Sequence, residues 1–262
     1  MSNALPTQSQ LESIGYEDRY CTFVDVLGFS EIIAGIGRGD VDVWEIRNLL
    51  DKVHTRDHSA SATADKTLRA QSISDGVCLS TAVTADGLRE LLFSLEQLTT
   101  GLLAEGYFVR GGVVRGRIYH DKNMVFGDAL VRAYRIESLI AKYPRIVIES
   151  DVAKEAIRIA QDQPDRTEYV KQASDGPYFL HVLRLIDVVL RGDKDDRLGL
   201  LSTYNGMAEM IQARLNAAVD RPRHYEKVHW FADYWNDVAF ATHGRVPTIK
   251  GPGLGFTLGV LA

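Results

Sequence analysis

The chain has 262 residues, of which 45% are hydrophobic and 25% are charged, a composition typical of a folded globular protein. The formal net charge of −5 argues against a general nucleic-acid binder, because phosphate backbones attract basic surfaces. The two cysteines, Cys21 and Cys78, stand far apart in apolar runs. This excludes a disulfide framework or a zinc module and favours a reducing compartment.

The chain carries no segment that we expect to enter a membrane. No apolar stretch reaches the length of about 18 residues that a membrane span needs. Residues 1–18 are polar, with neither a basic start nor an apolar segment, so we expect a mobile leader rather than a signal peptide. We therefore expect a cytoplasmic protein with no membrane partner.

The first half of the chain begins with a strong strand signal over 20–29, YCTFVDVLGF. Its nearly continuous apolarity is typical of a strand buried on both faces. Ser30 is expected to cap a helix over 31–36, and apolar spacing predicts a second helix over 43–53. The runs LRAQSIS and VCLSTAV, joined by Asp75-Gly76, predict a β-hairpin, since both turn positions tolerate positive φ.

The elements that follow complete an α+β fold. In chain order we expect a helix over 84–104 ended by Gly106, a glycine-bearing strand over 107–119, a helix over 128–142, a strand over 143–149, a helix over 150–161, and strands within 169–172 and 178–185. This order predicts a mixed sheet with helices on one face. We expect one domain over 19–187 and a C-terminal helical extension over 188–262, with helices over 198–218 and 223–242.

Two aspartates stand where a metal site could form. Asp25 lies in the buried strand, where an unpaired carboxylate is costly, and Asp75 lies at the predicted hairpin tip. Each has a structural alternative, since a strand-end aspartate bonds to nearby N–H groups and Asp-Gly is a usual turn sequence. Paired in one sheet, however, the two carboxylates would meet at one edge and repel each other unless a cation lies between them. Mg²⁺ and Mn²⁺ prefer such ligands, and the helix N-terminus after Asp25 could seat phosphates.

Three collinear blocks resemble the class III nucleotidyl cyclases. FVDVLGFSEI resembles their first metal-binding segment, F-x-D-[IV]-x-G-F-[ST], and SISDGV is similar to their second metal-binding hairpin. VRGGVVRGRIYHDKNMVFGDALVRAYRIES resembles their third block, in which a glycine strand leads to V-F-G-D and a helix ending in R-[LI]-E-S; YPRIVIE resembles the next strand. The match covers about residues 20–182 and implies a ferredoxin-type sheet carrying a cyclase catalytic domain.

The resemblance implies roles for individual residues. Asp25 and Asp75 would bind two divalent ions, Mn²⁺ or Mg²⁺, with the Val26 carbonyl as a further ligand. Arg135 would contact the phosphates in the transition state. Lys171 lies near the position of the family's phosphate-binding lysine, but aligning the two requires a gap in the sequence. For Arg135 and Lys171 the alternative is an ordinary surface residue. Family sites lie between two chains, so the resemblance implies a homodimer in which the aspartates of one subunit face Arg135 of the other.

The positions that contact the base and ribose depart from the purine cyclases. Their ribose-binding asparagine is replaced by Val131, and their base-reading positions by Arg69, Gln71 and Met124, while Phe29 of the first block completes the substrate-binding set. Methionine cannot make the usual polar purine contact. Arg69 offers only donors, which suit the carbonyl oxygens of uracil, and Gln71 could accept from its N3–H. The alternative is that Arg69 and Gln71 simply alternate outward on a strand.

These departures, together with the helical extension KVHWFADYWNDV, resemble the pyrimidine cyclases of bacterial Pycsar antiphage systems. The resemblance implies conversion of the substrate UTP to 3′,5′-cyclic UMP and pyrophosphate, and a separate effector linked through this product only. Open alternatives are a cytidylate cyclase making cyclic CMP, a purine cyclase, and an inactive nucleotide-binding domain. A diguanylate-cyclase relative is disfavoured, because the hairpin reads S-I-S-D-G instead of a G-G-[DE]-E-F-like turn.

Overall fold

The computed structural model describes residues 14–39, 42–44, 47, 68–74, 76–162, 169–186 and 199–251. The chain forms two compact units, residues 1–184 and 185–262, whereas the sequence suggested a boundary between 187 and 188. The first strand begins at Tyr16, earlier than the expected domain start at residue 19.

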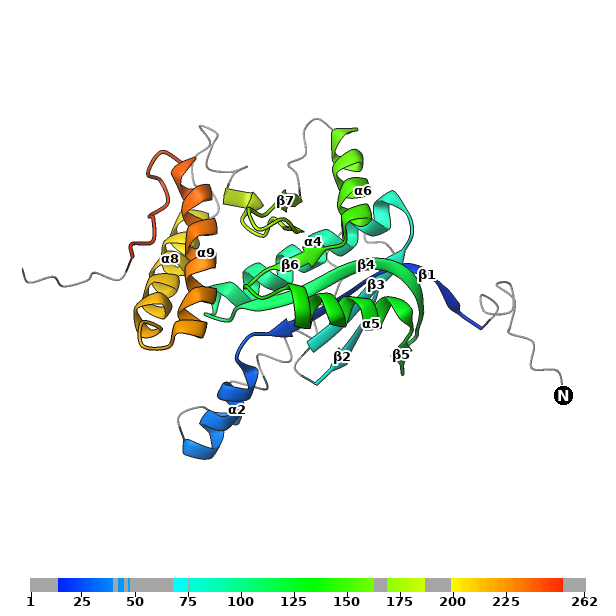
Figure 1. Ribbon diagram of the computed structural model, residues 1–262, viewed down its shortest axis with the longest axis horizontal. Coiled ribbons are helices and arrows are strands. Elements are labelled where there is room, and N and C mark those ends of the chain that lie inside the picture. The colour runs from blue at the N-terminus through cyan, green and yellow to red at the C-terminus, as the bar shows by residue number, and fades with distance from the viewer. Residues whose placement is uncertain are drawn as a thin grey trace, which may run out of the picture. The chain divides into compact units, whose positions relative to one another are not determined.

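The first unit contains an eight-stranded sheet, in which seven strands follow the order β2-β3-β1-β4-β6-β8-β7 and β5 pairs with β4. β1 is antiparallel to both β3 and β4, whereas β4 and β6 are parallel. The sheet is therefore mixed, which confirms the predicted α+β class (Figure 1). The strands are β1 Tyr16–Val26, β2 Arg69–Ile73, β3 Gly76–Ala82, β4 Val109–His120, β5 Val125–Phe126, β6 Ile146–Ile148, β7 Val170–Gln172 and β8 Tyr178–Leu180.

The helices of the first unit largely follow the predicted segments. They are α2 Phe29–Arg38, α4 Ala85–Ala104, α5 Asp128–Arg135, the π-helix η2 Ile136–Ile140 and α6 Ser150–Gln161. α4 begins at Thr84, whose side chain accepts a hydrogen bond from the Gly87 N–H. α2, however, is preceded by Gly28 with φ 81°, without a side-chain cap, so the prediction that Ser30 caps it is wrong. The predicted helix over 43–53 lies mostly outside the described residues.

The helices cover both faces of the sheet, so the prediction that they lie on one face is wrong. α5 packs on the face that bears Cys21, Phe23 and Val114, and Figure 1 shows α4 on the other side of the sheet. The neighbouring residues Val113 and Val114, which point to opposite faces, are both 0% exposed. α5 can lie close to the sheet because β4 carries glycines that leave room for its backbone.

The predicted hairpin is confirmed, but its turn differs. Ile73 pairs with Gly76, so Gly76 belongs to β3 rather than to the turn, and Ser74 has the positive φ of 59°. Gly76 is required for packing, since a β-carbon there would lie 2.6 Å from Cζ of Phe23. Asp75 lies outside the described residues.

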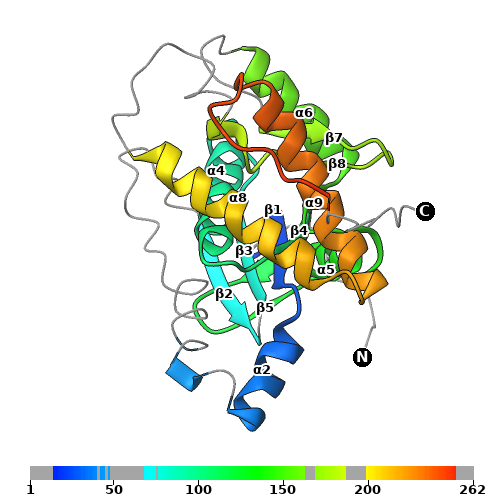
Figure 2. The same cartoon turned by 90° about the vertical axis from the view of Figure 1, so that its left-hand side faces the viewer.

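The second unit is a helical hairpin of α8, Leu200–Ala217, and α9, Pro222–Phe240, whose helices lie side by side (Figure 2). Both helices were predicted. Their core includes Tyr204 and Trp235, whose rings lie 6.4 Å apart. No helix of the described residues is long and apolar enough to cross a membrane.

An extended segment after α9 is held to this hairpin by two amide side chains. Asn236 accepts from the N–H of Ile249 at 2.7 Å and donates to its carbonyl at 2.9 Å. Gln212 of α8 makes the same pair of bonds with Lys250, at 2.7 and 2.9 Å. Trp235 adds a bond from Nε1 to the Pro247 carbonyl. All of these bonds are to main-chain atoms.

Candidate functional site

Asp25 lies at the end of β1, where the three blocks of the cyclase resemblance meet. In the sheet register it stands opposite Gly76 of β3 and Arg110 of β4. The Arg110 guanidinium lies between two carboxylates, with Nη2 3.5 Å from Asp25 Oδ2 and Nε 2.5 Å from Glu137 Oε1. The Arg110–Glu137 contact is an ion pair without hydrogen-bond geometry. Asp25, Arg110 and Glu137 therefore form one charged cluster.

The π-helix η2 brings Glu137 to this cluster. Glu137 is 2% exposed, although it follows the exposed end of α5. The helix can take this position only because residue 112 is a glycine. A β-carbon there would lie 2.5 Å from the Ala133 carbonyl oxygen and 2.7 Å from Ile136 Cβ. The absence of a side chain lets the helix approach β4 until Glu137 reaches Arg110. Sequence reasoning missed both Arg110 and Glu137.

The predicted metal ligands fit a hard divalent cation only in part. The Asp25 side chain is 19% exposed, so its oxygens can be reached from solvent, and carboxylate and carbonyl oxygens suit Mg²⁺ or Mn²⁺. Val26 follows it as the last residue of β1. Asp75, the second predicted ligand, lies outside the described residues. Within the described ranges, no group of three or more His, Cys, Asp or Glu side chains could hold a metal ion.

The two predicted phosphate-binding residues lie on separate elements. Arg135 ends α5 with an exposed side chain, and it makes no hydrogen bond or ion pair with any residue that the structure describes. Lys171 lies on β7, which is four strands away from β1 in the sheet order. At about 4.8 Å per strand, that places Lys171 about 19 Å from β1. The structure therefore does not bring Lys171 to Asp25 within one chain.

Three predicted base-reading residues do come together. Arg69 donates from Nη1 to the His120 carbonyl, and Gln71 donates from Nε2 to the Asn123 carbonyl at 3.0 Å. Both side chains of β2 therefore reach the turn that carries Met124, which is 51% exposed. Gln71 Oε1 is buried and has no hydrogen-bond partner among the described residues.

The other two predicted substrate contacts lie elsewhere. Phe29 is the first residue of α2 and is half-buried. Val131, on α5, is 49% exposed. Neither lies on β2 or on the turn between β4 and β5, so these two positions are separate from the Arg69–Gln71–Met124 group in the fold.

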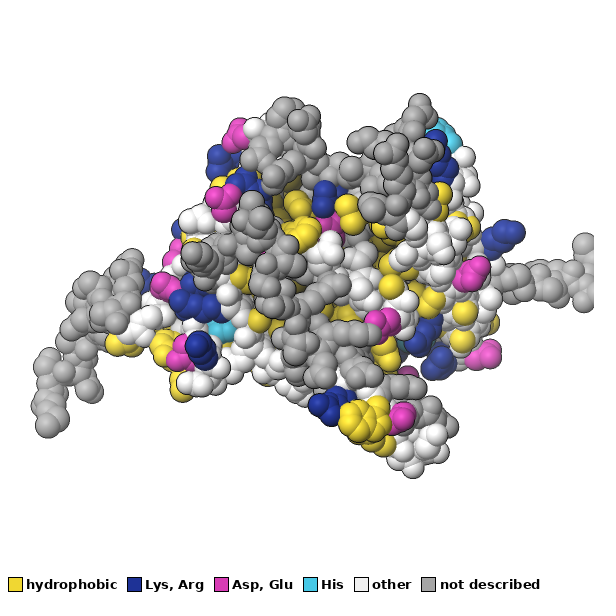
Figure 3. Space-filling view, turned by 180° about the vertical axis from the view of Figure 1, so that it is seen from behind, with side chains coloured by type: hydrophobic (Ala, Val, Ile, Leu, Met, Phe, Trp, Pro, Cys, Tyr) yellow, Lys and Arg dark blue, Asp and Glu magenta, His cyan; other side chains and the backbone are white. Residues whose placement is uncertain are grey.

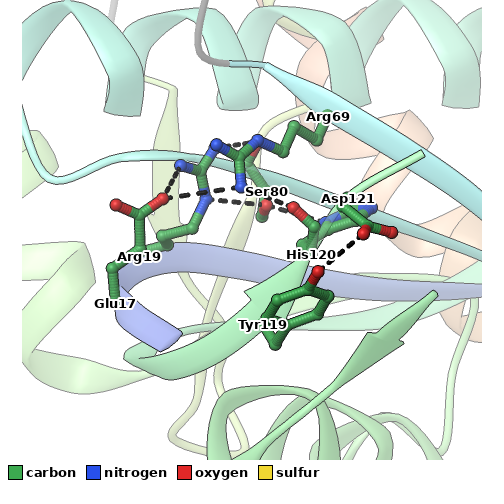
Figure 4. A network of polar contacts seen from close by, with 7 residues as sticks. All are labelled: Glu17, Arg19, Arg69, Ser80, Tyr119, His120 and Asp121. Carbon is green, nitrogen blue, oxygen red and sulfur yellow. Dashed lines mark hydrogen bonds and ion pairs between the residues drawn. The ribbon is translucent and has the colours of Figure 1, made fainter. Parts of the chain in front are cut away.

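A buried polar network adjoins that group (Figure 4). Arg19 donates from Nε to Ser80 Oγ at 2.9 Å and from Nη1 to Glu17 at 2.7 Å. Ser80 Oγ in turn lies 2.8 Å from His120 Nδ1. Either Ser80 or His120 can be the donor in this contact, depending on the imidazole tautomer. His120 is 1% exposed, and burial, with the charges of Arg19 and Arg69, lowers its pKa to about 4.

The network borders a cavity of about 530 Å³, which is within the usual size of a small-molecule site. Arg69, Tyr119, His120 and Lys122 contribute to its wall, with apolar surface from Leu68. His120 Nε2 is buried without a hydrogen-bond partner in the described part of the chain. Sequence reasoning found Arg69 but missed His120, because an isolated histidine carries no spacing signal.

Elsewhere the described surface carries mixed charge. On the face shown in Figure 3, basic and acidic side chains are interspersed over the described residues. Comparison with protein-family models found no match, and comparison with curated proteins found none either.

Proposed function

We propose that the chain is a pyrimidine nucleotide cyclase that converts UTP to 3′,5′-cyclic UMP and pyrophosphate. The observation that carries the proposal is the adjacency of the three cyclase-like blocks, since β1 with Asp25 lies between β3 and β4. The strand order β2-β3-β1-β4, with helices after β1 and β3, is also the order expected of a ferredoxin-type β-α-β-β-α-β unit.

In this proposal, Asp25, Asp75 and the Val26 carbonyl hold two divalent ions, Mn²⁺ or Mg²⁺. When bound, these ions neutralise the triphosphate and make the ribose 3′-OH more acidic. The 3′-oxygen forms a bond to the α-phosphorus, the bond from that phosphorus to the β-phosphate oxygen breaks, and the hydroxyl proton passes to solvent. Because the attack is intramolecular, the positioning of UTP supplies much of the rate.

Arg135 stabilises the negative charge that develops on the α-phosphate and on pyrophosphate. Its exposed position at the end of α5 supports a role toward another chain, which fits a homodimer with composite sites. Lys171 is proposed to bind the phosphates.

Uracil recognition is assigned to the group around the β4–β5 turn. Gln71 Nε2 donates to the Asn123 carbonyl. Its Oε1, which is buried in the structure, would accept from uracil N3–H once the amide turns toward the base. Arg69 donates to a uracil carbonyl, and Met124 supplies an apolar contact to the base. Phe29 and Val131, which lie on α2 and α5, are proposed to contact the base and ribose from outside this group. Cytosine has no N3–H, so this donor–acceptor pattern favours UTP over CTP.

The test is incubation of the purified chain with each of the four ribonucleoside triphosphates and Mn²⁺, followed by product analysis. We expect cyclic UMP from UTP, and loss of product in Asp25→Asn. Asp18→Asn, on the same strand but exposed and paired with Arg115, is the matched control and should retain activity. Cyclic CMP, or a cyclic purine nucleotide, as the main product would replace the proposal by the corresponding alternative. No cyclic product from any triphosphate would leave a nucleotide-binding domain.

The proposed biological role is antiphage defence. Cyclic UMP would act as a second messenger made in the bacterial cytoplasm, and a separate effector would respond to it without contacting this chain. Bacteria that express the chain together with its effector should resist phage, and Asp25→Asn should remove that resistance.

A further inference from the structure

The Arg69 guanidinium is held by only one of its three nitrogens. Nη1 donates to the His120 carbonyl and lies 3.5 Å from Glu17 Oε1 (Figure 4). Nε and Nη2 have no hydrogen-bond or ion-pair partner among the residues that the structure describes, and the side chain is 40% exposed. Nε and Nη2 form the edge of an arginine that can bind two oxygens of a carboxylate or a phosphate at once.

A second cation lies on the wall of the cavity that Arg69 lines. Lys122, in the turn between β4 and β5, is exposed and makes no hydrogen bond or ion pair within the described part of the chain. Asp121 is the acidic residue of this wall. Its carboxylate accepts from the Tyr119 hydroxyl at 2.6 Å and from two backbone N–H groups of the turn. The wall therefore carries two positive charges with unused donors and one carboxylate that is already engaged.

The unused donors of this wall suit a phosphate better than a carboxylate. The Arg69 edge can hold two oxygens, and the Lys122 ammonium can hold a third. A phosphate monoester has three terminal oxygens that accept hydrogen bonds, whereas a carboxylate has two. The cavity volume of about 530 Å³ leaves room for more than a phosphate group, and Leu68 and Ala70 add apolar wall. These dimensions fit a small organic molecule that carries a phosphate.

The cavity lies far from Asp25 of the same chain. Tyr119 of the cavity wall pairs with Tyr16 at one end of β1, whereas Arg110, nine positions earlier on β4, pairs with Asp25 at the other end. At about 3.3 Å per residue, these two pairs are about 30 Å apart. A phosphate in the cavity is therefore distinct from a triphosphate held at Asp25 of that chain.

We propose that this cavity binds the phosphate group of a small organic molecule, with Arg69 on two of its oxygens and Lys122 on the third. The inference goes beyond the proposed function but shares Arg69 with it. A phosphate on Nε and Nη2 occupies the donors that a uracil carbonyl would use, so the ligand competes with UTP for Arg69.

The test is isothermal titration calorimetry of the full-length chain with inorganic phosphate, without nucleotide or metal. Arg69→Lys keeps the positive charge but loses the two-nitrogen edge, and we expect phosphate to bind about tenfold more weakly. Lys122→Met removes the third donor, and we expect binding to weaken about threefold.

Lys142→Met is the matched control, because it removes an exposed lysine that does not line the cavity. It changes the net charge by the same amount as Lys122→Met and should leave phosphate binding unchanged. Thermal unfolding without phosphate checks that each variant is folded.

Weaker binding in both cavity variants, with unchanged binding in the control, supports the inference. It is overturned if the unmodified chain binds no phosphate, if Arg69→Lys binds it as tightly as the unmodified chain, or if Lys142→Met weakens binding as much as Lys122→Met. Acetate bound as tightly as phosphate would overturn the choice of phosphate over carboxylate.

The inference and the proposed function can fail separately. If the chain makes cyclic UMP but binds no phosphate through Arg69 and Lys122, the inference fails and the proposed function stands. If phosphate binds through these two residues but no triphosphate is cyclised, the proposed function fails and the phosphate site stands.

Discussion

Arg184 donates two hydrogen bonds to the buried carboxylate of Glu96, from Nε to Oε1 at 3.2 Å and from Nη2 to Oε2 at 2.8 Å. The Glu96 side chain is 0% exposed, and burial raises its pKa, although Arg184 opposes the shift. The guanidinium also lies 4.3 Å from the ring centre of Tyr169. The last residue of the first unit is thus fixed to the middle of α4.

Removing this arginine should destabilise the first unit. Arg184→Met leaves Glu96 buried without its charged partner, and we expect a loss of about 3–5 kcal/mol in the free energy of unfolding. Urea denaturation followed by fluorescence measures it. Arg89→Met, on the same helix but paired with the exposed Asp86, should cost at most about 1 kcal/mol. Equal losses in the two variants would contradict this account.

The close approach of α5 to β4 predicts opposite effects of two glycine substitutions. Gly112→Ala would place a β-carbon 2.5 Å from the Ala133 carbonyl oxygen, so we expect a loss of about 1–3 kcal/mol from overpacking. A β-carbon at Gly37 in α2 meets none of the described residues within 4 Å, and Gly37→Ala should gain about 0.5–1 kcal/mol. Chemical denaturation of both variants checks the signs, and a neutral Gly112→Ala would show that η2 is free to shift.

Burial of neutral His120 predicts a pH dependence of stability. Its pKa falls from 6.5 to about 4 on folding, so between these values the unfolded chain binds a proton that the folded chain does not. The free energy of unfolding is therefore unaffected by His120 above pH 6.5. As the pH falls from 6.5 toward 4, protonation of His120 in the unfolded chain lowers it by roughly 3 kcal/mol in total. His120→Gln should flatten the unfolding free energy over this range, whereas the half-exposed His229→Gln should not. If the free energy of unfolding of His120→Gln depended on pH as it does in the unmodified chain, other groups would be responsible for that dependence.

Composite sites predict complementation between inactive variants. Asp25→Ala and Arg135→Ala should each lack cyclase activity, because each removes one half of every site in a homodimer. In mixed heterodimers one of the two sites is intact, so we expect up to about half of the unmodified activity in that species. Co-expression with two different affinity tags isolates the heterodimer for assay. A complete lack of activity in it would count against shared sites.

Much of the fold could be predicted from local pattern. The limits of α6, Ser150–Gln161, match the prediction, because its apolar spacing is regular and a strand ends directly before it. The start of α2 did not match, since Gly28 in a left-handed conformation begins that helix where a serine cap was expected. A glycine that allows positive φ competes with a serine cap, and the sequence alone does not rank the two.

The helix layers and the charged cluster depend on long-range contacts. The continuous apolarity of β1 already required cover on both faces, and a consistent interpretation of it would have placed helices on both. Arg110 and Glu137 are 27 positions apart in the chain, so no local periodicity joins them. The signal in the sequence that could have indicated Arg110 is an arginine in a glycine-rich strand that pairs with the strand of Asp25. Asp75 lies outside the described residues, and its role remains a prediction.

The side-chain amides of Asn236 and Gln212 form hydrogen bonds with the main chain of Ile249 and Lys250. These hydrogen bonds do not depend on the side chain of the bound residue, so the exposed Lys250 can be replaced without losing them, whereas the side chain of Ile249 is itself buried. Proline alone is forbidden at either site, because it has no amide hydrogen to offer.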